Sequence, residues 1–385
     1  MRSLAPTAAI AIFVISAGRS WGADDLGRTV TAKIFKGVLI RPAQASQQQM
    51  KHFAADGYNA VVLYLDDDTP AGQSRVAARR IQRTGLQLHY WIEIARNPAL
   101  ADAHPEWMAS LQTHSEWRRH FPKFPQLATN QVAKTYPWVP VLYAETFEVH
   151  RKRVAVLLKG MPEAEGIFLN DLQGAPSACG CGNHFCRWTT DYGPITTAHR
   201  LPNDAAANFI LAVRKVAPGM QVIPVWTTEC AEHDRPKGAA CDGVACFTGR
   251  CWREYNAQLM PVAEVCERIG VLLPFRDFDV GLSRTGPDAE WQRYALNSFT
   301  EILPQREGRA IPQSRLIAVL QAWDVNLEQR RMQIRHAEAA GAAGYVMALT
   351  KIDQNWEPRL MEVPLADKRR PSAKAPHAHG SAVPH

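Results

Sequence analysis

The stretch RLIAVLQAWDVNLEQRRMQIRHAEAAGAAGYVMALTKID (residues 315–353) decides the fold, because it holds one complete strand–helix–strand unit. Its two ends, 315–324 and 344–353, are short aliphatic runs that are typical of buried strands. Between them, residues 327–342 mix charged and apolar side chains with the period of an amphipathic helix. A strand, a helix and a second strand in this order predict two parallel strands joined by a helical crossover.

The same unit recurs along the chain, with helical patterns such as 74–85 between the apolar runs. Runs that suit strands stand at eight places: 36–42, 60–67, 87–95, 166–172, 221–229, 270–278, 315–324 and 344–353. Eight such units predict an α/β fold, a (β/α)8 TIM barrel, as a single domain over residues 33–355. A doubly wound open sheet is the alternative, but no G-x-G-x-x-G sequence follows the first run.

The two ends of the chain differ in composition from this predicted domain. Residues 1–22 combine a basic residue with an apolar run and end on small residues, a pattern typical of a secretion signal peptide. The apolar run has about half of the roughly 20 residues that a membrane helix needs. We therefore expect a secreted or periplasmic protein with no integral membrane segment in the mature chain. Residues 366–385 are rich in Pro, Ala and His and predict a disordered tail.

The formal net charge of the chain is +7. Much of this charge lies outside the predicted barrel, because Arg2 and Arg19 are near the signal and the basic residues of the tail outnumber its single Asp. The small charge that remains on the barrel does not favour nucleic acid or an anionic surface as the partner.

Charged side chains follow almost every predicted strand. In a barrel of this kind, the carboxyl ends of the strands carry the active site. The residues at these ends are mostly acidic, and they include Arg41, Asp66, Asp67, Asp68, Glu93, Asp171, Glu229, Asp277, Asp279, Asp324, Lys351 and Asp353. Solvent exposure of the loops is an alternative explanation, because charged residues commonly end strands where the chain enters water. Two carboxylates in a common cleft also suit glycoside hydrolysis, in which one protonates the leaving oxygen and the other attacks the anomeric carbon or activates water.

The third run places three side chains on one face. His89, Trp91 and Glu93 are spaced two residues apart, so a strand points all three to the same side. An imidazole, an indole and a carboxylate together suit a sugar ring, although His89 and Trp91 could equally fill the barrel wall. The candidate substrate-binding residues are His89, Trp91, Glu93, Arg41, Asn170, Asp277 and Trp323.

Seven of the eight cysteines lie in two long predicted loops, after the fourth and fifth strands: Cys179, Cys181, Cys186, Cys230, Cys241, Cys246 and Cys251. Export favours disulfides. The Cys-x-Cys spacing of Cys179 and Cys181 suits two separate partners or two ligands of one tetrahedral zinc, to which Cys186 could also bind. Disulfides and zinc both stay open, and either would stiffen the loop next to Asp171. Beyond a structural zinc, we expect no required cofactor.

A set of motifs spans roughly residues 87–193. It consists of HPEW (104–107), a helix over 144–160, FLND (168–171) and CGCGNHFC…DYG (179–193). This set resembles the barrel β-galactosidases that carry a cysteine–zinc cluster. The resemblance implies that Asp171 is the acid/base, that Asn170 contacts the sugar 2-hydroxyl, and that Asp324 is the nucleophile after the seventh strand. Asp stands at both positions where that family has Glu, and the third cysteine follows after four residues instead of two.

The residue types at the strand ends also resemble the barrel α-glycosidases. That group has an aspartate nucleophile after strand four, a glutamate acid/base after strand five and an aspartate after strand seven. Asp171, Glu229 and Asp324 match by type, whereas Leu169 stands where that group has Arg. We therefore expect a secreted glycoside hydrolase with these three catalytic candidates and a carbohydrate substrate. Two other functions stay open: a carbohydrate-binding barrel without catalysis, and a protein whose cysteine loops bind zinc.

Overall fold

The computed structural model describes residues 34–108, 118, 121–141, 144–172, 200–227, 260–274, 290–301, 309–352 and 357–362. The chain divides into two compact units, residues 1–34 and Phe35–His385. All the secondary structure described below belongs to the second unit.

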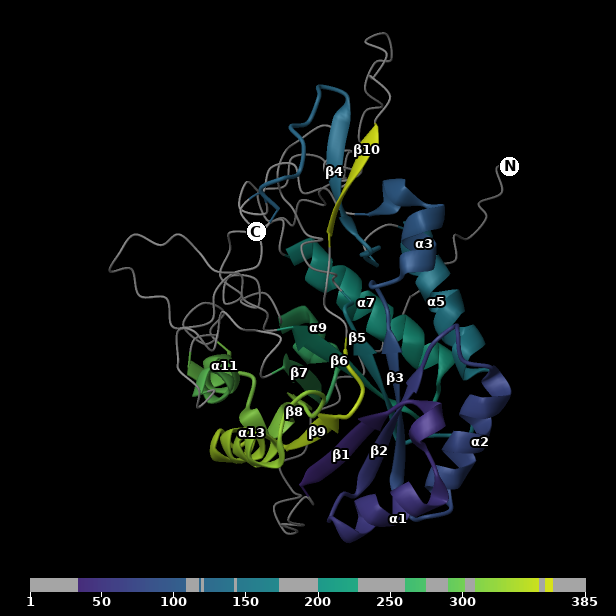
Figure 1. Ribbon diagram of the computed structural model, residues 1–385, viewed down its shortest axis with the longest axis vertical. Helices are drawn as coiled ribbons and strands as arrows, with labels where there is room; N and C mark the ends of the chain where they lie inside the picture. Colours follow the sequence, from purple (N-terminus) through teal and green to yellow (C-terminus); the bar gives the residue numbers. More distant parts are fainter. Residues whose placement is uncertain are drawn as a thin grey trace, which may run out of the picture. The chain divides into compact units, whose positions relative to one another are not determined.

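Eight parallel strands form a closed barrel (Figure 1). Each strand pairs with the next barrel strand along the chain, and the last one pairs with the first. The strands are β1 (Phe35–Ile40), β2 (Ala60–Leu65), β3 (Gln87–Glu93), β5 (Gly166–Asn170), β6 (Gln221–Thr227), β7 (Ile269–Leu273), β8 (Leu316–Gln321) and β9 (Gly344–Ala348). The predicted (β/α)8 barrel is confirmed, and each of its eight strands lies within or next to a predicted run.

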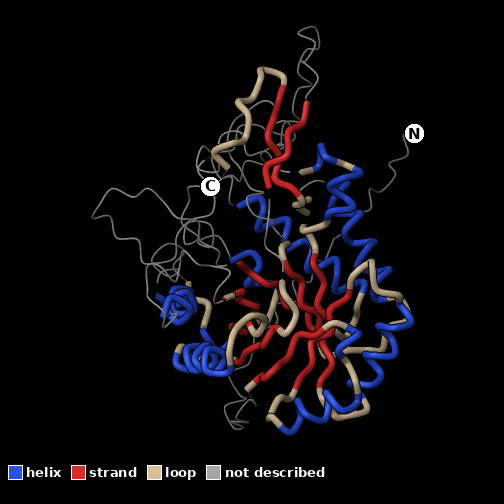
Figure 2. Tube along the Cα trace, in the orientation of Figure 1, coloured by secondary structure: helices blue, strands red, loops and turns tan. Residues whose placement is uncertain are grey.

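Helices surround these strands, as Figure 2 shows. They are α1 (Gln47–Ala55), α2 (Ala71–Gln82), α3 (Pro98–Ala103), α5 (Ala144–Leu158), α7 (Arg200–Val216), α9 (Met260–Val265), α11 (Glu290–Glu301) and α13 (Leu327–Ala339), with short 3-10 turns at η1 (Pro42–Gln44), η2 (Pro105–Trp107) and η3 (Gln313–Arg315). Local sequence sets where some of them begin. The Ser46 side chain accepts a hydrogen bond from Gln49 N at the start of α1, and Asn326 and Gln329 form a capping box at the start of α13.

The barrel strands are buried on both faces. Inside the barrel, Leu39, Val62 and Phe168 belong to one apolar cluster. A second cluster lies between the strands and the helices and includes Ile81 and Phe209. Burial on both faces explains why the strand sequences are continuous apolar runs, as is usual for a parallel sheet covered by helices.

Two further strands form a separate antiparallel sheet that no sequence pattern predicted. β4 (Gln131–Tyr136) lies in the chain between β3 and β5, and β10 (Glu357–Glu362) follows β9 and pairs with the whole of β4. β10 also lies beyond residue 355, where we expected the barrel domain to end. Strands so far apart in the chain are joined only by tertiary pairing, and the prolines around β4 interrupt its periodic pattern.

The predicted runs extend past the observed strands at their carboxyl ends. The run 344–353, for example, continues beyond Ala348, because Leu349 and Ile352 pack against the core from within a loop. The predicted signal peptide (1–22), the tail (366–385) and the cysteine-rich loops lie outside the described residues. In the described part of the chain, no helix has both the length and the hydropathy needed to cross a membrane.

Gly344, the first residue of β9, provides a test of barrel closure. Its φ is 156°, and a Cβ atom at this position would overlap the carbonyl group of Phe35 in β1. Because backbone of the neighbouring strand cannot move aside without opening the ladder, we expect Gly344→Ala to lower the free energy of unfolding by more than about 2 kcal/mol. Urea unfolding followed by circular dichroism measures this change.

Gly72→Ala is the matched control for this substitution. Gly72 lies in α2, and a Cβ placed there would have no atom of the described residues within 4 Å apart from its own helix backbone and chain neighbours. Alanine is favoured over glycine in a helix by about 0.5–1 kcal/mol, so this variant should match or exceed the wild type in stability. Two variants of equal stability would contradict the role assigned to Gly344.

Candidate functional site

The carboxyl ends of the eight parallel strands lie at one end of the barrel, and most predicted site residues lie there. Arg41 follows β1, Asp66 follows β2, Glu93 ends β3, Asn170 ends β5 and is followed by Asp171, and Trp323 and Asp324 follow β8. Glu229, Asp277 and the three cysteines Cys179, Cys181 and Cys186 lie outside the described residues.

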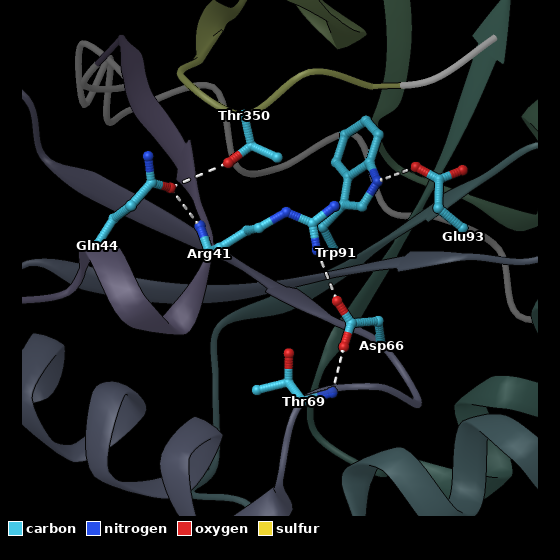
Figure 3. A network of polar contacts seen from close by, with 7 residues as sticks. All are labelled: Arg41, Gln44, Asp66, Thr69, Trp91, Glu93 and Thr350. Carbon is cyan, nitrogen blue, oxygen red and sulfur yellow. Dashed lines mark hydrogen bonds and ion pairs between the residues drawn. The ribbon is translucent and has the colours of Figure 1, made fainter. Parts of the chain in front are cut away.

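A buried carboxyl group, that of Glu93, joins the ends of β3 and β5. Its Oε1 accepts a hydrogen bond from Trp91 Nε1 at 2.6 Å, which Figure 3 shows, and its Oε2 accepts one from Asn170 Nδ2 at 2.8 Å. Burial raises the pKa of Glu93, and these two bonds together with Arg96 and Arg153 offset part of the rise. Both oxygens of Glu93 are thus engaged, which suits this residue to orienting Asn170.

Asp171 follows Asn170 and turns the chain out of the strand. Its φ is 54°, a left-handed conformation that Asp adopts more readily than most residues with a side chain, and its exposed fraction is 6%. Ala95 N donates to Asp171 O at 3.1 Å, and Ile94 N donates to Asn170 O at 3.0 Å. These two bonds extend the β3–β5 ladder beyond the strands and hold the backbone of Asp171.

The small antiparallel sheet continues this support. Just after β4, Val139 N donates to Ala95 O at 2.8 Å, so the peptide that holds Asp171 is itself held. The buried His150 of α5 contacts Val139 O through Nε2 at 2.7 Å. β10 in turn pairs along β4. The carboxyl-terminal strand is therefore linked to Asp171 through a short series of backbone contacts.

Arg41 and Asp66 form an ion pair across the ends of β1 and β2 (Figure 3). Arg41 Nη1 donates to Asp66 Oδ2 at 2.7 Å, and the guanidinium lies 4.4 Å from the centre of the Tyr64 ring. Gln44 Oε1 accepts from Arg41 N at 2.7 Å and from Thr350 Oγ1 at 3.0 Å, which ties β1 to the loop after β9. The Arg41 side chain is 45% exposed, so its remaining donors can reach a ligand.

Tyr64 and Arg153 are two residues of this rim that were not predicted. Tyr64 precedes Asp66 by two residues and points to the same face, a spacing that could have identified it. Its pKa is raised by burial and, to a lesser degree, by the Glu93 charge. Arg153 lies in α5, where its helical position gave no such signal. It pairs with Asp67 at 2.5 Å and donates to Glu93 O at 2.6 Å.

The placement of His89 and Trp91 corrects the idea that they form a sugar platform. His89 is 4% exposed and packs against Phe35 and Phe168 inside the barrel, with ring centres 5.1 and 5.8 Å away. Trp91 has no exposed surface and stacks on Phe168 at 5.9 Å. Both rings fill the barrel wall because residues of this parity point inward well below the rim. Trp91 contributes to the site through its bond to Glu93.

The end of β8 carries a second aspartate with an unusual backbone. Asp324 has a φ of 52° and is exposed. Asp171 and Asp324 are the two non-glycine residues with positive φ in the described part of the chain. Trp323 is 8% exposed and belongs to the apolar cluster inside the barrel, so its ring does not form an open platform either.

No metal site is formed by the residues that the structure describes. Among them, no three His, Cys, Asp or Glu side chains are grouped closely enough to hold an ion. Cys266 is the one cysteine in the described ranges; it is buried and its Sγ donates to Val262 O at 3.0 Å. The zinc and disulfide alternatives for Cys179, Cys181 and Cys186 therefore stay predictions.

Neither protein-family models nor curated proteins match this chain. Among solved structures, the β-galactosidase of the Antarctic haloarchaeon Halorubrum lacusprofundi is similar, with a TM-score of 0.51, 13% identity, and coverage of 82% of this chain and 52% of that one. The β-galactosidase of Marinomonas ef1 has a TM-score of 0.48 and 12% identity, and the match covers 82% of this chain and 54% of that one. For the endo-1,4-β-D-mannanase of Thermotoga petrophila, the TM-score is 0.43 and the identity 11%, with coverage of 82% of this chain and 87% of that one. This chain spans about half the length of the two β-galactosidases. The likeness to the first shows a shared barrel fold.

The pH dependence of stability provides a test of where His89 lies. Burial, with a smaller contribution from Arg268, lowers the pKa of His89 from 6.5 to about 4. Below pH 6.5 the unfolded chain binds a proton that the folded chain does not bind until about pH 4. The stability that neutral His89 contributes is thus full above pH 6.5 and is lost as the pH falls toward 4, by at most about 1.4 kcal/mol per pH unit.

We expect His89→Phe to remove this loss, because Phe fits among aromatic rings and does not titrate. Urea unfolding at several pH values between 7 and 4 should show the variant gaining stability relative to the wild type as the pH falls. His150, whose pKa burial also lowers to about 4, remains in both proteins and supplies a common background. If the difference in unfolding free energy between His89→Phe and the wild type stayed constant across this pH range, His89 would be in contact with solvent.

A second test concerns Glu93. Because burial raises its pKa above the ordinary value of 4.5, the folded chain holds the proton to a higher pH than the unfolded chain. The stability that protonated Glu93 contributes to the folded state is full below pH 4.5 and is lost as the pH rises through the raised pKa. We expect the wild type to lose stability relative to Glu93→Gln from pH 4.5 upward, measured by urea unfolding. A relative gain with rising pH would show that the hydrogen bonds outweigh burial.

Proposed function

We propose that this protein is a secreted glycoside hydrolase in which Asp171 acts as the general acid. The observation that carries the proposal is the left-handed backbone that Asp171 and Asp324 share. Such conformations cost most residues about 1–2 kcal/mol, and they persist where surrounding contacts enforce them, often at active sites. Both aspartates follow barrel strands at the end where this fold carries its chemistry.

Several contacts of Asp171 support a role in proton donation. The residue is largely screened from solvent, and Ala95 holds its backbone. Its neighbour Asn170 is oriented by Glu93 through Nδ2, while Asn170 Oδ1 has no hydrogen-bond partner among the described residues. Asn170 has no exposed surface, so a sugar hydroxyl would supply the missing donor once the side chains that cover this oxygen move aside. Bound in this way, a glycoside would place its leaving oxygen beside the Asp171 carboxyl group, as general acid catalysis requires.

Asp324 would supply the second carboxylate. It follows the seventh barrel strand, and its exposed side chain would attack the anomeric carbon or activate a water molecule. In the alternative set of roles, that of the α-glycosidases which the sequence also resembles, Glu229 would be the acid/base and Asp171 the nucleophile. The separation of the two carboxyl groups sets the outcome, since about 5–5.5 Å suits retention and about 6.5–9.5 Å suits inversion.

Other parts of the proposed site rest on the rim and on the sequence. Arg41 and Asp66 would bind sugar hydroxyl groups, because they present a half-exposed guanidinium beside a carboxylate. Cys179, Cys181 and Cys186 would brace the loop after Asp171 through disulfides or a structural zinc. Secretion rests on the signal-like residues 1–22.

A carbohydrate-binding barrel without catalysis is the second candidate function. The exposure of Asp324 favours it, because a nucleophile open to water lacks the low-dielectric surroundings that strengthen electrostatic catalysis. In addition, Asp is one methylene shorter than the Glu that stands at both positions in the β-galactosidases that the sequence resembles. A shorter side chain could leave a bound sugar intact.

Asp171→Asn tests the proposed role of this residue. Asparagine tolerates the same left-handed backbone but donates no acidic proton, so we expect kcat to fall by about 10²- to 10⁴-fold with little change in KM. The measurement is hydrolysis of a panel of aryl glycosides and natural oligosaccharides by the purified mature protein. Unfolding free energies of wild type and variant should agree within about 1 kcal/mol.

Asp56→Asn is the matched control, because Asp56 is exposed and lies before β2, at the opposite end of the barrel. It should retain full activity. Hydrolysis that survives in Asp171→Asn would remove this residue from the mechanism. A wild type that binds oligosaccharides without cleaving them would instead support the carbohydrate-binding function.

A further inference from the structure

β8 runs one residue beyond the last residue pair that it forms with β7. β7 and β8 pair up to Leu273 and Leu320, and β7 ends there while β8 continues to Gln321. The next residue, Ala322, donates from its N to Ala348 O on the β9 side at 2.9 Å. Because successive residues of a strand direct their N–H and C=O groups to alternate sides, the N–H and C=O of Gln321 both face the side where β7 has ended.

The side chain of Gln333 binds both of these backbone groups of Gln321. Its Oε1 accepts from Gln321 N at 3.0 Å, and its Nε2 donates to Gln321 O at 2.8 Å. A primary amide presents the same donor and acceptor as a peptide group, so one side chain of α13 satisfies both backbone groups. Gln333 is fully buried, and such groups would otherwise stay unpaired away from water.

A second buried glutamine fixes Gln333 in turn. Gln292 of α11 donates from Nε2 to Gln333 Oε1 at 3.2 Å and to Leu273 O at 2.7 Å. The last carbonyl of β7 and the substitute partner of β8 are thus bound by the same amide. α11 and α13 together close the gap that opens between the two strands.

The residues that lead from Gln321 to Asp324 are held on every side. Gln321 Nε2 donates to Trp323 O at 3.1 Å, and Arg330 donates to Ala322 O at 2.6 Å. Asp324 follows directly with its left-handed φ of 52°. These bonds restrain the backbone that leads to the Asp324 carboxylate.

We propose that Gln333 is a positioning residue for Asp324, and that it acts by binding the backbone of Gln321 at the end of β8. The inference rests on the proposed function, because it concerns the carboxylate assigned to the second catalytic role. Gln333 does not touch the rim itself, so its loss should leave substrate contacts in place. It should change how often Asp324 is correctly oriented for reaction.

Gln333→Met tests this role, because Met has a similar volume but neither donates nor accepts a backbone hydrogen bond of this kind. We expect kcat to fall about tenfold or more while KM changes by less than about threefold. Amide hydrogen exchange followed by mass spectrometry should speed up in peptides covering 316–326 and not in those covering β2. The matched control is Gln48→Met, an exposed position in α1, which should change neither quantity.

A double-mutant cycle separates positioning from general loosening of the fold. If Gln333 acts through Asp324, Gln333→Met should cause no further loss of kcat in the Asp324→Asn background. Independent, multiplicative losses would overturn the proposal, and so would an unchanged kcat in the single variant. If Gln333→Met does not fold, Arg330→Met removes a milder contact of the same segment. An unchanged kcat in that variant, with faster exchange at 316–326, would equally overturn the proposal.

A failure of the proposed function gives a different result. A wild type without hydrolytic activity on the glycoside panel would overturn that function, and the positioning role with it. Normal hydrolysis by Gln333→Met, by contrast, would overturn only the positioning role.

Discussion

Closure of a parallel hydrogen-bonded ladder is the constraint on which the rest of this structure depends. The pairing of β9 with β1 removes both sheet edges and brings the carboxyl ends of all eight strands to one rim. At Gly344 the two backbones approach so closely that no side chain fits between them. Arg41, Glu93, Asp171 and Asp324 are far apart in sequence and share this rim only because the barrel closes.

The rim itself is built by satisfying polar groups where the ladder stops. At two of the strand ends that the structure describes, other groups continue the hydrogen bonding of the ladder. At β5 the backbone of residues 94 and 95 supplies the partners, and at β8 the side chain of Gln333 does so. An aspartate with a left-handed backbone follows in both places, directly after Asn170 at β5 and three residues after Gln321 at β8. The same physical requirement thus fixes the direction of both candidate carboxylates.

Burial divides the polar residues of the site by role. Glu93 is buried, has both oxygens bound and has a pKa raised by burial, so it holds Asn170 in place. Arg41 is held by Asp66 and Tyr64 but remains half-exposed, which suits contact with a ligand. A buried carboxyl group suits support and a partly exposed guanidinium suits recognition, because only an exposed group can contact a ligand directly.

The amino-acid sequence by itself determined the eight strands, the barrel and the acidic character of its rim, because buried parallel strands are read directly from local apolar runs. It also identified Asp171 and Asp324 as residues that follow such runs. Only the tertiary structure decided that His89 and Trp91 lie inside the wall, that β4 pairs with β10, and that Tyr64, Arg153 and Gln333 belong around the site. Those outcomes depend on how deep a residue lies in the barrel and on partners that are distant in the chain. A local sequence pattern contains no information about either.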